Sequence, residues 1–318
     1  MEKILKGEDF ENRYRITGQL KTLSPLHIGT GEETDAVYSE QERSKLNERL
    51  GKAPLVSMVM KDGAGKPIIP GSALKGIMRH WLLNILVGIG PAWATTRDFE
   101  KEPLADLSQK QQIETVKSDF SWLEILFGTP FHEGKIEVWD ACCLTKSVAA
   151  PDGLLHWNDK SLTYIDTSVA IDPATGTAIE HLLYKTEVVP PGVLFDFNLA
   201  GQNLSETELG LILLALQGFN STIYPIRIGA RGGRGYGRVQ FIPGPVYRLE
   251  KGNVKDWIKG AIEGFSLNYS NVDTSASKFE GKDAGYYTLP QLGEAEQKKL
   301  ITDVKAELNK ILSESAKS

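Results

Sequence analysis

The stretch PIIPGSALKGIMRHWLLNIL, residues 67–86, decides how this chain folds, because it joins a rigid turn to a strongly patterned helix. Two prolines and a glycine make the turn, and Ser72 is predicted to cap the N-terminus of the helix. Lys75, Arg79 and His80 fall mostly off the apolar stripe of this helix. The stripe itself has helical spacing and is expected to pack inward: Leu74, Ile77, Met78, Trp81, Leu82 and Ile85.

Strands are predicted on both sides of this helix. Residues 14–20 (YRITGQL) alternate apolar and polar, and GKIEVWDA (134–141) and VLFDFNLAG (193–201) also show strand patterns. SETELGLILLALQGF (205–219) is predicted to form a second helix, and RVQFIPGPV (238–246) a returning strand. The order strand, helix, strand, hairpin, strand, helix, strand is typical of a ferredoxin-like α+β core with insertions.

The remaining stretches are predicted to be insertions and an extension of a core domain at residues 12–245. The insertions are expected at about 32–56, 92–122 and 145–190. The second has helical content, and in the third the turn DPATG (172–176) between two β-rich arms predicts a projecting hairpin. Residues 246–318 are expected to form a C-terminal helical extension, whose last helix has an apolar face: Leu300, Ile301, Val304, Leu308 and Ile311.

Composition excludes several classes of protein. The chain has 318 residues, of which 41% are hydrophobic and 24% charged, so it is neither disordered nor fibrous. No apolar run is long enough to span a membrane, so no membrane partner is expected. The adjacent Cys142 and Cys143 are poorly placed for a disulfide, which favours a reduced, cytoplasmic protein. The histidines and cysteines show no metal-ligand spacing, and we expect neither a zinc site nor an organic cofactor.

The segment PIRIGARGGRGYGRVQ (225–240) carries the strongest functional signal. It holds Arg227, Arg231, Arg234 and Arg238 together with five glycines, and it contains no acidic residue. Glycine lets backbone N–H groups approach phosphates closely, arginine makes charge-assisted contacts with them, and the Tyr236 ring offers a surface for base stacking. These features favour nucleic-acid binding despite a net charge of −5. The alternative is a flexible, solvated surface loop.

The helix predicted at residues 73–88 offers a second place for an anion. A Gly-Ser turn precedes it, and the free N–H groups and dipole of a helix N-terminus attract negative charge. Lys75 and Arg79 are four residues apart and therefore lie on one side of the helix. The alternative is a capped core helix that carries two solvated bases.

Four motifs in order resemble the RAMP superfamily of CRISPR proteins, and more narrowly the backbone-type subunits of type III effector complexes. They are PLHIGTG (25–31), PIIPGSALKGIMRHWL (67–82), LFGTP followed by GKIEVWDA (126–141), and GARGGRGYGRV (229–239). The resemblance implies an RRM-like core that holds a guide RNA (crRNA) in antiviral defence. It also implies three kinds of partner, namely guide RNA, complementary target RNA, and other CRISPR effector subunits that include neighbouring RAMP proteins.

The same resemblance assigns roles to individual residues. A thumb hairpin near residues 165–190 would wedge between guide and target strands, with Ile171, Pro173 and Leu182 as the wedge residues. Contacts with RNA are implied for eight residues: His27, Ser72, Lys75, Arg79, Arg231, Arg234, Tyr236 and Arg238.

Cleavage of RNA is left open by the sequence. In cleaving relatives, an aspartate lies in the loop between the HIGxG and PGS motifs, and here that position reads as Leu55 or Val56. Asp35 is the remaining catalytic candidate, and magnesium is expected only if the chain cleaves. Two other functions stay open: an endoribonuclease that processes precursor guide RNA, and a non-catalytic assembly scaffold.

Overall fold

The computed structural model describes residues 4–96, 104–149, 156–255 and 291–315. Its central feature is an antiparallel sheet of four strands in the order β10-β1-β9-β5. The strands are β1 (Asn12–Thr22), β5 (Ile136–Val138), β9 (Leu194–Gln202) and β10 (Val239–Glu250). Helix α2 (Gly71–Leu86) lies between β1 and β5 in the chain, and α5 (Glu206–Gly218) between β9 and β10. This order and topology confirm the predicted ferredoxin-like α+β core.

Strand β1 is central because both of its edges are paired. Ile16 lies opposite Leu199 of β9 and Val246 of β10. Tyr14, Ile16 and Leu20 are buried, whereas the intervening side chains are more exposed, as the alternation of the sequence predicts. Strand β10 continues to Glu250, so the sheet extends beyond the predicted domain limit at residue 245.

The start of α2 differs from the prediction. The N-cap residue is Pro70 rather than Ser72, and the Gly71 N–H donates to a carboxylate oxygen of Asp140 at 2.8 Å. A Cβ at Gly71 would lie 2.0 Å from the Val138 carbonyl oxygen, so only glycine allows this approach. The prediction that Ser72 caps the helix is therefore wrong, because a carboxylate from a distant segment binds the first N–H group.

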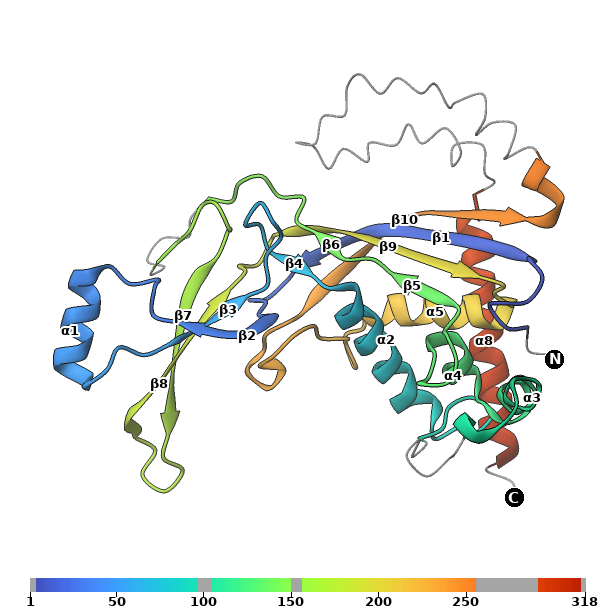
Figure 1. Cartoon of the computed structure of the whole chain (residues 1–318), viewed down its shortest axis with the longest axis horizontal. Coiled ribbons are helices and arrows are strands. Elements are labelled where there is room, and N and C mark those ends of the chain that lie inside the picture. The colour runs from blue at the N-terminus through green and yellow to red at the C-terminus, as the bar shows by residue number, and fades with distance from the viewer. Residues whose placement is uncertain (1–3, 97–103, 150–155, 256–290, 316–318) are drawn as a thin grey trace.

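The apolar stripe of α2 packs as the sequence predicts. Ile77 and Ile85 are half-buried, and the rest of the stripe is buried: Leu74, Met78, Trp81 and Leu82. Figure 1 shows α2 and α5 below the strands, with α4 and α8 beside them.

Helix α8 (Glu294–Ser315) explains why α5 is buried nearly all round. A Cβ at Gly210 of α5 would lie 2.4 Å from a methyl group of Val304, so the two helices touch closely. The predicted apolar face of α8 is buried at Leu300, Ile301, Val304 and Leu308, and half-buried at Ile311. The C-terminal helical extension is confirmed here, whereas residues 256–290 lie outside the described part.

A second sheet, in the order β2-β3-β8-β7, carries the predicted hairpin. Its strands are β2 (Gly29–Thr34), β3 (Val56–Val59), β7 (Tyr164–Ile171) and β8 (Ala178–Val188). At the hairpin turn, the Asp172 N–H donates to the Thr177 carbonyl at 2.8 Å. Together with α1 (Glu40–Leu50), strands β7 and β8 extend to the left of the core sheet in Figure 1. The thumb hairpin is confirmed.

The helical insertion is also confirmed. It contains a 3₁₀ turn at Leu104–Asp106 and helix α3 (Gln109–Asp119), and α4 (Trp122–Phe127) follows it in the chain. Together with Leu5 of the N-terminal segment, this region forms a small apolar cluster: Leu104, Val116, Phe120 and Ile125. Just before α2 in the chain, β4 (Ile68–Ile69) pairs with β6 (Ala141–Cys142) as a short antiparallel ladder.

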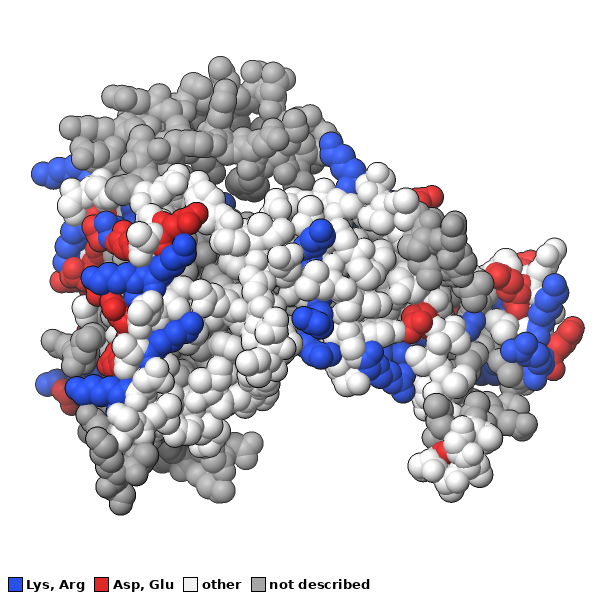
Figure 2. Space-filling view, turned by 180° about the vertical axis from the view of Figure 1, so that it is seen from behind, with Lys and Arg blue, Asp and Glu red and all other residues white. Residues whose placement is uncertain are grey.

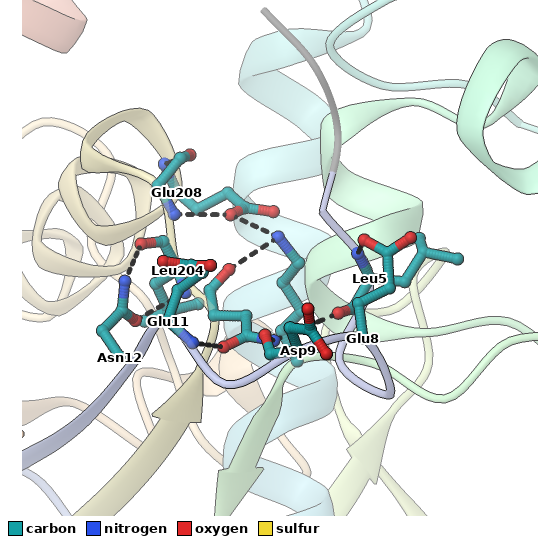
Figure 3. A network of polar contacts seen from close by, with 10 residues as sticks. Leu5, Glu8, Asp9, Glu11, Asn12, Leu204 and Glu208 are labelled. Atoms are coloured by element: carbon teal, nitrogen blue, oxygen red, sulfur yellow. Dashed lines mark hydrogen bonds and ion pairs between the residues drawn. The ribbon is translucent and has the colours of Figure 1, made fainter. Parts of the chain in front are cut away.

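A buried ion pair joins the residue before β5 to the start of α5, and a neighbouring asparagine holds the N-terminal segment. The Lys135 Nζ lies 2.7 Å from a Glu208 carboxylate oxygen, and the two side chains are 1% and 0% exposed. Lys135 also donates to the Asn203 carbonyl, and the Asn203 side chain donates to the carbonyls of Leu5 and Asp9. Figure 3 shows this network closing around the N-terminal segment, with Asn12 and Leu204 beside it. Removing one partner would leave an uncompensated buried charge.

Candidate nucleic-acid interface

The glycine-rich segment forms a closed loop. Arg227 and Arg238 face each other as an antiparallel bridge, and the Ile228 N–H donates to the Gly237 carbonyl at 2.8 Å. Between them lies a 3₁₀ turn at Gly232–Arg234, with Arg231 in the left-handed conformation at φ 63°. The loop therefore has a defined backbone, unlike the flexible loop of the alternative reading.

Backbone contacts anchor this loop to residues 23–27. The Ala230 N–H donates to the His27 carbonyl at 3.0 Å, and the Gly237 N–H to the Pro25 carbonyl at 2.9 Å. A Cβ at Gly229 or Gly237 would lie 2.1 Å from a backbone carbonyl oxygen, and both residues have positive φ. These two glycines are thus required for packing.

The four arginines of the loop have different surroundings. Arg227 donates to the Gly232 carbonyl at 2.7 Å and so closes the loop internally. Arg231 is half-buried and reaches the Ser168 hydroxyl of β7 at 3.4 Å. Arg234 and Arg238 are exposed. The last two therefore present their charge to solvent, where a phosphate could bind.

Tyr236 connects the loop to the hairpin. Its hydroxyl donates to the carboxylate of Asp166 on β7, and burial together with that carboxylate raises the pKa of Tyr236. Asp166 and Ser168 were missed by sequence reasoning, because they are some 70 and 63 positions away in the chain from their partners. No local motif marks them.

His27 lies beneath the loop and is only 4% exposed. Its Nδ1 lies 2.8 Å from the Glu187 carbonyl, and burial lowers the pKa of the imidazole. The adjacent Glu187 carboxylate accepts from Lys61 Nζ and Thr163 Oγ1, both at 2.6 Å. Contact between His27 and RNA remains a prediction, and this burial argues against it.

On α2, the predicted RNA-contacting residues also differ in exposure. Ser72 is exposed and Arg79 is half-buried. Lys75 is half-buried as well, and its Nζ donates to the Ile136 carbonyl at 3.0 Å. Burial lowers the pKa of Lys75. Contacts of these three residues with RNA remain predictions. For Lys75, such a contact requires its ammonium group to leave the Ile136 carbonyl.

With this geometry established, comparison with known proteins decides the family. A model of the RAMP superfamily matches residues 19–240. The chain belongs to the RAMP superfamily. It is 25% identical over 255 residues to the CRISPR system Cmr subunit Cmr6 of Pyrococcus furiosus, a match that covers 71% of this chain and 68% of that protein. It is also 25% identical over 239 residues to the CRISPR system Cms endoribonuclease Csm3 of Enterococcus italicus, covering 73% and 90% respectively.

The RAMP match contains α2, the hairpin and the glycine-rich loop, so the resemblance predicted from the four motifs is confirmed. Within this RAMP fold, Pro173 is exposed at the hairpin turn, Ile171 ends β7, and Leu182 lies in β8. Their proposed action as a wedge between strands remains a prediction.

The catalytic aspartate expected from the RAMP resemblance has no clear counterpart. Val56 is buried in β3, and Leu55 is an exposed apolar residue. Asp35 follows β2, and its carboxylate lies 3.3 Å from a guanidinium nitrogen of Arg43. Across the described ranges, no group of three His, Cys, Asp or Glu side chains could hold a metal ion. A role for magnesium at Asp35 stays a prediction, made only for a chain that cleaves RNA.

The surface of this RAMP protein separates charge by region. Figure 2 shows acidic and basic side chains mixed at both ends of one face, whereas the centre carries Lys and Arg with few acidic neighbours. In the parts of the chain that the structure describes, no helix is long and apolar enough to cross a membrane.

Proposed function

We propose that this RAMP protein binds the guide RNA of a type III CRISPR effector complex and helps to hold the guide–target duplex. The observation that carries the proposal is the exposure of Arg234 and Arg238 on a loop with a fixed backbone. A fixed loop loses little conformational entropy when it binds, so its charge–phosphate contacts contribute more fully to affinity.

The remaining loop residues support this role indirectly. Arg227 closes the loop, while Arg231 and Tyr236 connect it to β7. RNA held at the loop would therefore lie beside the base of the hairpin. We propose that base pairing of the guide reads the target sequence, and that this chain supplies backbone contacts and shape.

We further propose that the chain holds RNA without cutting it. One relative is named an endoribonuclease, but Asp35 is paired with Arg43 and an apolar side chain stands at the expected catalytic position. The other partners would be complementary target RNA and further CRISPR subunits, in keeping with a relative that is named a subunit of such a system.

Co-expression tests this function. The tagged chain is expressed with the other subunits of its complex and with a CRISPR array, purified, and its bound RNA is sequenced. We expect guide RNA of uniform length, together with a raised absorbance at 260 nm relative to 280 nm. An assembled complex that contains this chain but no guide RNA would contradict the proposal. Incubation of the isolated chain with repeat RNA should yield no cleavage product, which separates binding from guide processing.

A further inference from the structure

A pair of stacked aromatic rings lies at the surface between α5 and the glycine-rich loop. The rings of Trp81 and Tyr224 are 6.1 Å apart between centroids and inclined by 18°. Trp81 belongs to the core and is 8% exposed, whereas Tyr224 is 46% exposed. The two rings are offset and nearly parallel, so Trp81 packs against Tyr224 while nearly half of the tyrosine stays accessible to solvent.

Hydrogen bonds hold both the backbone of Tyr224 and the hydroxyl of its ring. The Trp81 indole donates to the Tyr224 carbonyl at 2.9 Å, and the Asn84 amide donates to the Tyr224 hydroxyl at 2.9 Å. The Tyr224 N–H donates to the Ser221 hydroxyl at 3.0 Å. The neighbouring Ile223 is 94% exposed although its loop is fixed in this way. The loop thus keeps a flat, apolar surface in contact with water.

The position of this surface suggests its ligand. Tyr224 precedes Arg227 by three residues, so their Cα atoms are at most about 11 Å apart. Arg227 pairs directly with Arg238, whose side chain is exposed. A phosphate bound at Arg238 would therefore place a nearby base of the same strand within reach of the Tyr224 ring.

We infer that Tyr224, supported by Trp81, is a stacking platform for an unpaired nucleobase of the bound RNA. The inference rests on the proposed RNA-binding function and adds a contact that is not electrostatic. Stacking on an aromatic ring tolerates any base, because every base has a π-face. The fixed ring is already oriented, so little side-chain entropy opposes the contact.

Binding of the purified full chain to a labelled, guide-length single-stranded RNA tests the platform. Tyr224→Ala should weaken binding about 5- to 150-fold, whereas Tyr224→Phe should stay close to wild type. The slope of log affinity against log salt should be unchanged in Tyr224→Ala, because no phosphate contact is lost. Thr222→Ala, in the same exposed loop, is the matched control and should have no effect.

A fluorescence measurement with the wild-type chain keeps the inference testable if Tyr224→Ala fails to fold. Single 2-aminopurine substitutions along the RNA should show strong quenching at one position, which Tyr224→Leu abolishes. An abasic substitution in the RNA at that position should weaken binding by the wild type and leave binding by Tyr224→Leu unchanged.

Equal affinities of wild type, Tyr224→Ala and Tyr224→Leu, or no position-specific quenching, would overturn the inference while leaving the proposed function intact. Loss of subunit assembly with unchanged RNA affinity would overturn it in favour of a protein contact. Absence of any salt-dependent RNA binding by the wild type would instead contradict the proposed function itself.

Discussion

The Tyr236 hydroxyl donates a hydrogen bond to the Asp166 carboxylate, and this contact joins the glycine-rich loop to strand β7 of the thumb hairpin. The same strand contributes Ser168, which lies 3.4 Å from Arg231. Asp166 and Ser168, two positions apart on β7, therefore accept hydrogen bonds from two residues of one loop. The loop and the base of the hairpin are thus positioned as a unit.

The first prediction concerns this contact. Tyr236→Phe and Asp166→Asn should each destabilise the protein by about 1–3 kcal/mol, because a hydrogen bond to a charged group is lost. The double variant should be little worse than either single variant, which a double-mutant cycle of urea unfolding would show. Tyr184→Phe, on the exposed face of β8, is the control for loss of a hydroxyl. Fully additive single effects would mean that the two residues do not interact.

The second prediction compares a closely packed glycine of the loop with one that has open space around it. Gly237→Ala should destabilise the protein by about 2 kcal/mol or more and weaken RNA binding, because φ is 77° and a Cβ would lie 2.1 Å from the Ile228 carbonyl. Gly233→Ala is the matched control, since a Cβ at Gly233 would meet no atom within 4 Å beyond its two chain neighbours. Thermal unfolding and filter binding report the two effects. Equal behaviour of the two variants would contradict the close packing described here.

The third prediction follows from the burial of His27. Because burial lowers its folded-state pKa, the unfolded chain takes up a proton first as the pH falls below about 6.5. Stability that is present above pH 6.5 is therefore lost as the pH falls through the folded pKa, at up to about 1.4 kcal/mol per pH unit. His27→Gln should show a shallower decline in unfolding free energy between pH 7 and 5. Identical pH dependence in both proteins would rule out His27 as the cause.

The fourth prediction concerns cleavage. Asp35→Ala should leave the products from a labelled, guide-complementary RNA unchanged in the assembled complex with magnesium, because Asp35 is engaged by Arg43. Its effect on stability should be below about 1 kcal/mol, as expected for a partly exposed ion pair. Loss of a single band at a fixed position would show instead that Asp35 is catalytic.

Sequence patterns predicted the elements of this fold better than their contacts. The apolar spacing of Leu74, Met78 and Leu82 predicts one face of α2, because burial and helical periodicity are local properties. The cap by Asp140 and the acceptor Asp166 were not predictable in this way. Each comes from a segment some 70 residues distant from its partner, and its role depends on how the strands are arranged in space.

The sequence predicts which residue types make up the candidate site, but not the different role of each residue. Four arginines and five glycines between residues 225 and 240 indicate anion binding. Only the folded loop shows that Arg227 binds Gly232, that Arg231 reaches β7, and that Gly237 is required by a carbonyl contact. The two residues left with exposed charge, Arg234 and Arg238, could not be distinguished from the others by type or spacing.

The most direct test of RNA binding by this loop is a salt series with Arg234→Ala/Arg238→Ala. Affinity for a guide-length RNA should fall, and the slope of log affinity against log salt should become shallower by about 1.4, or 0.7 for each lost phosphate contact. Lys298→Ala/Lys299→Ala removes the same charge from the exposed side of α8 and should leave the slope unchanged. Equal slopes for the loop variant and the wild type would contradict the account.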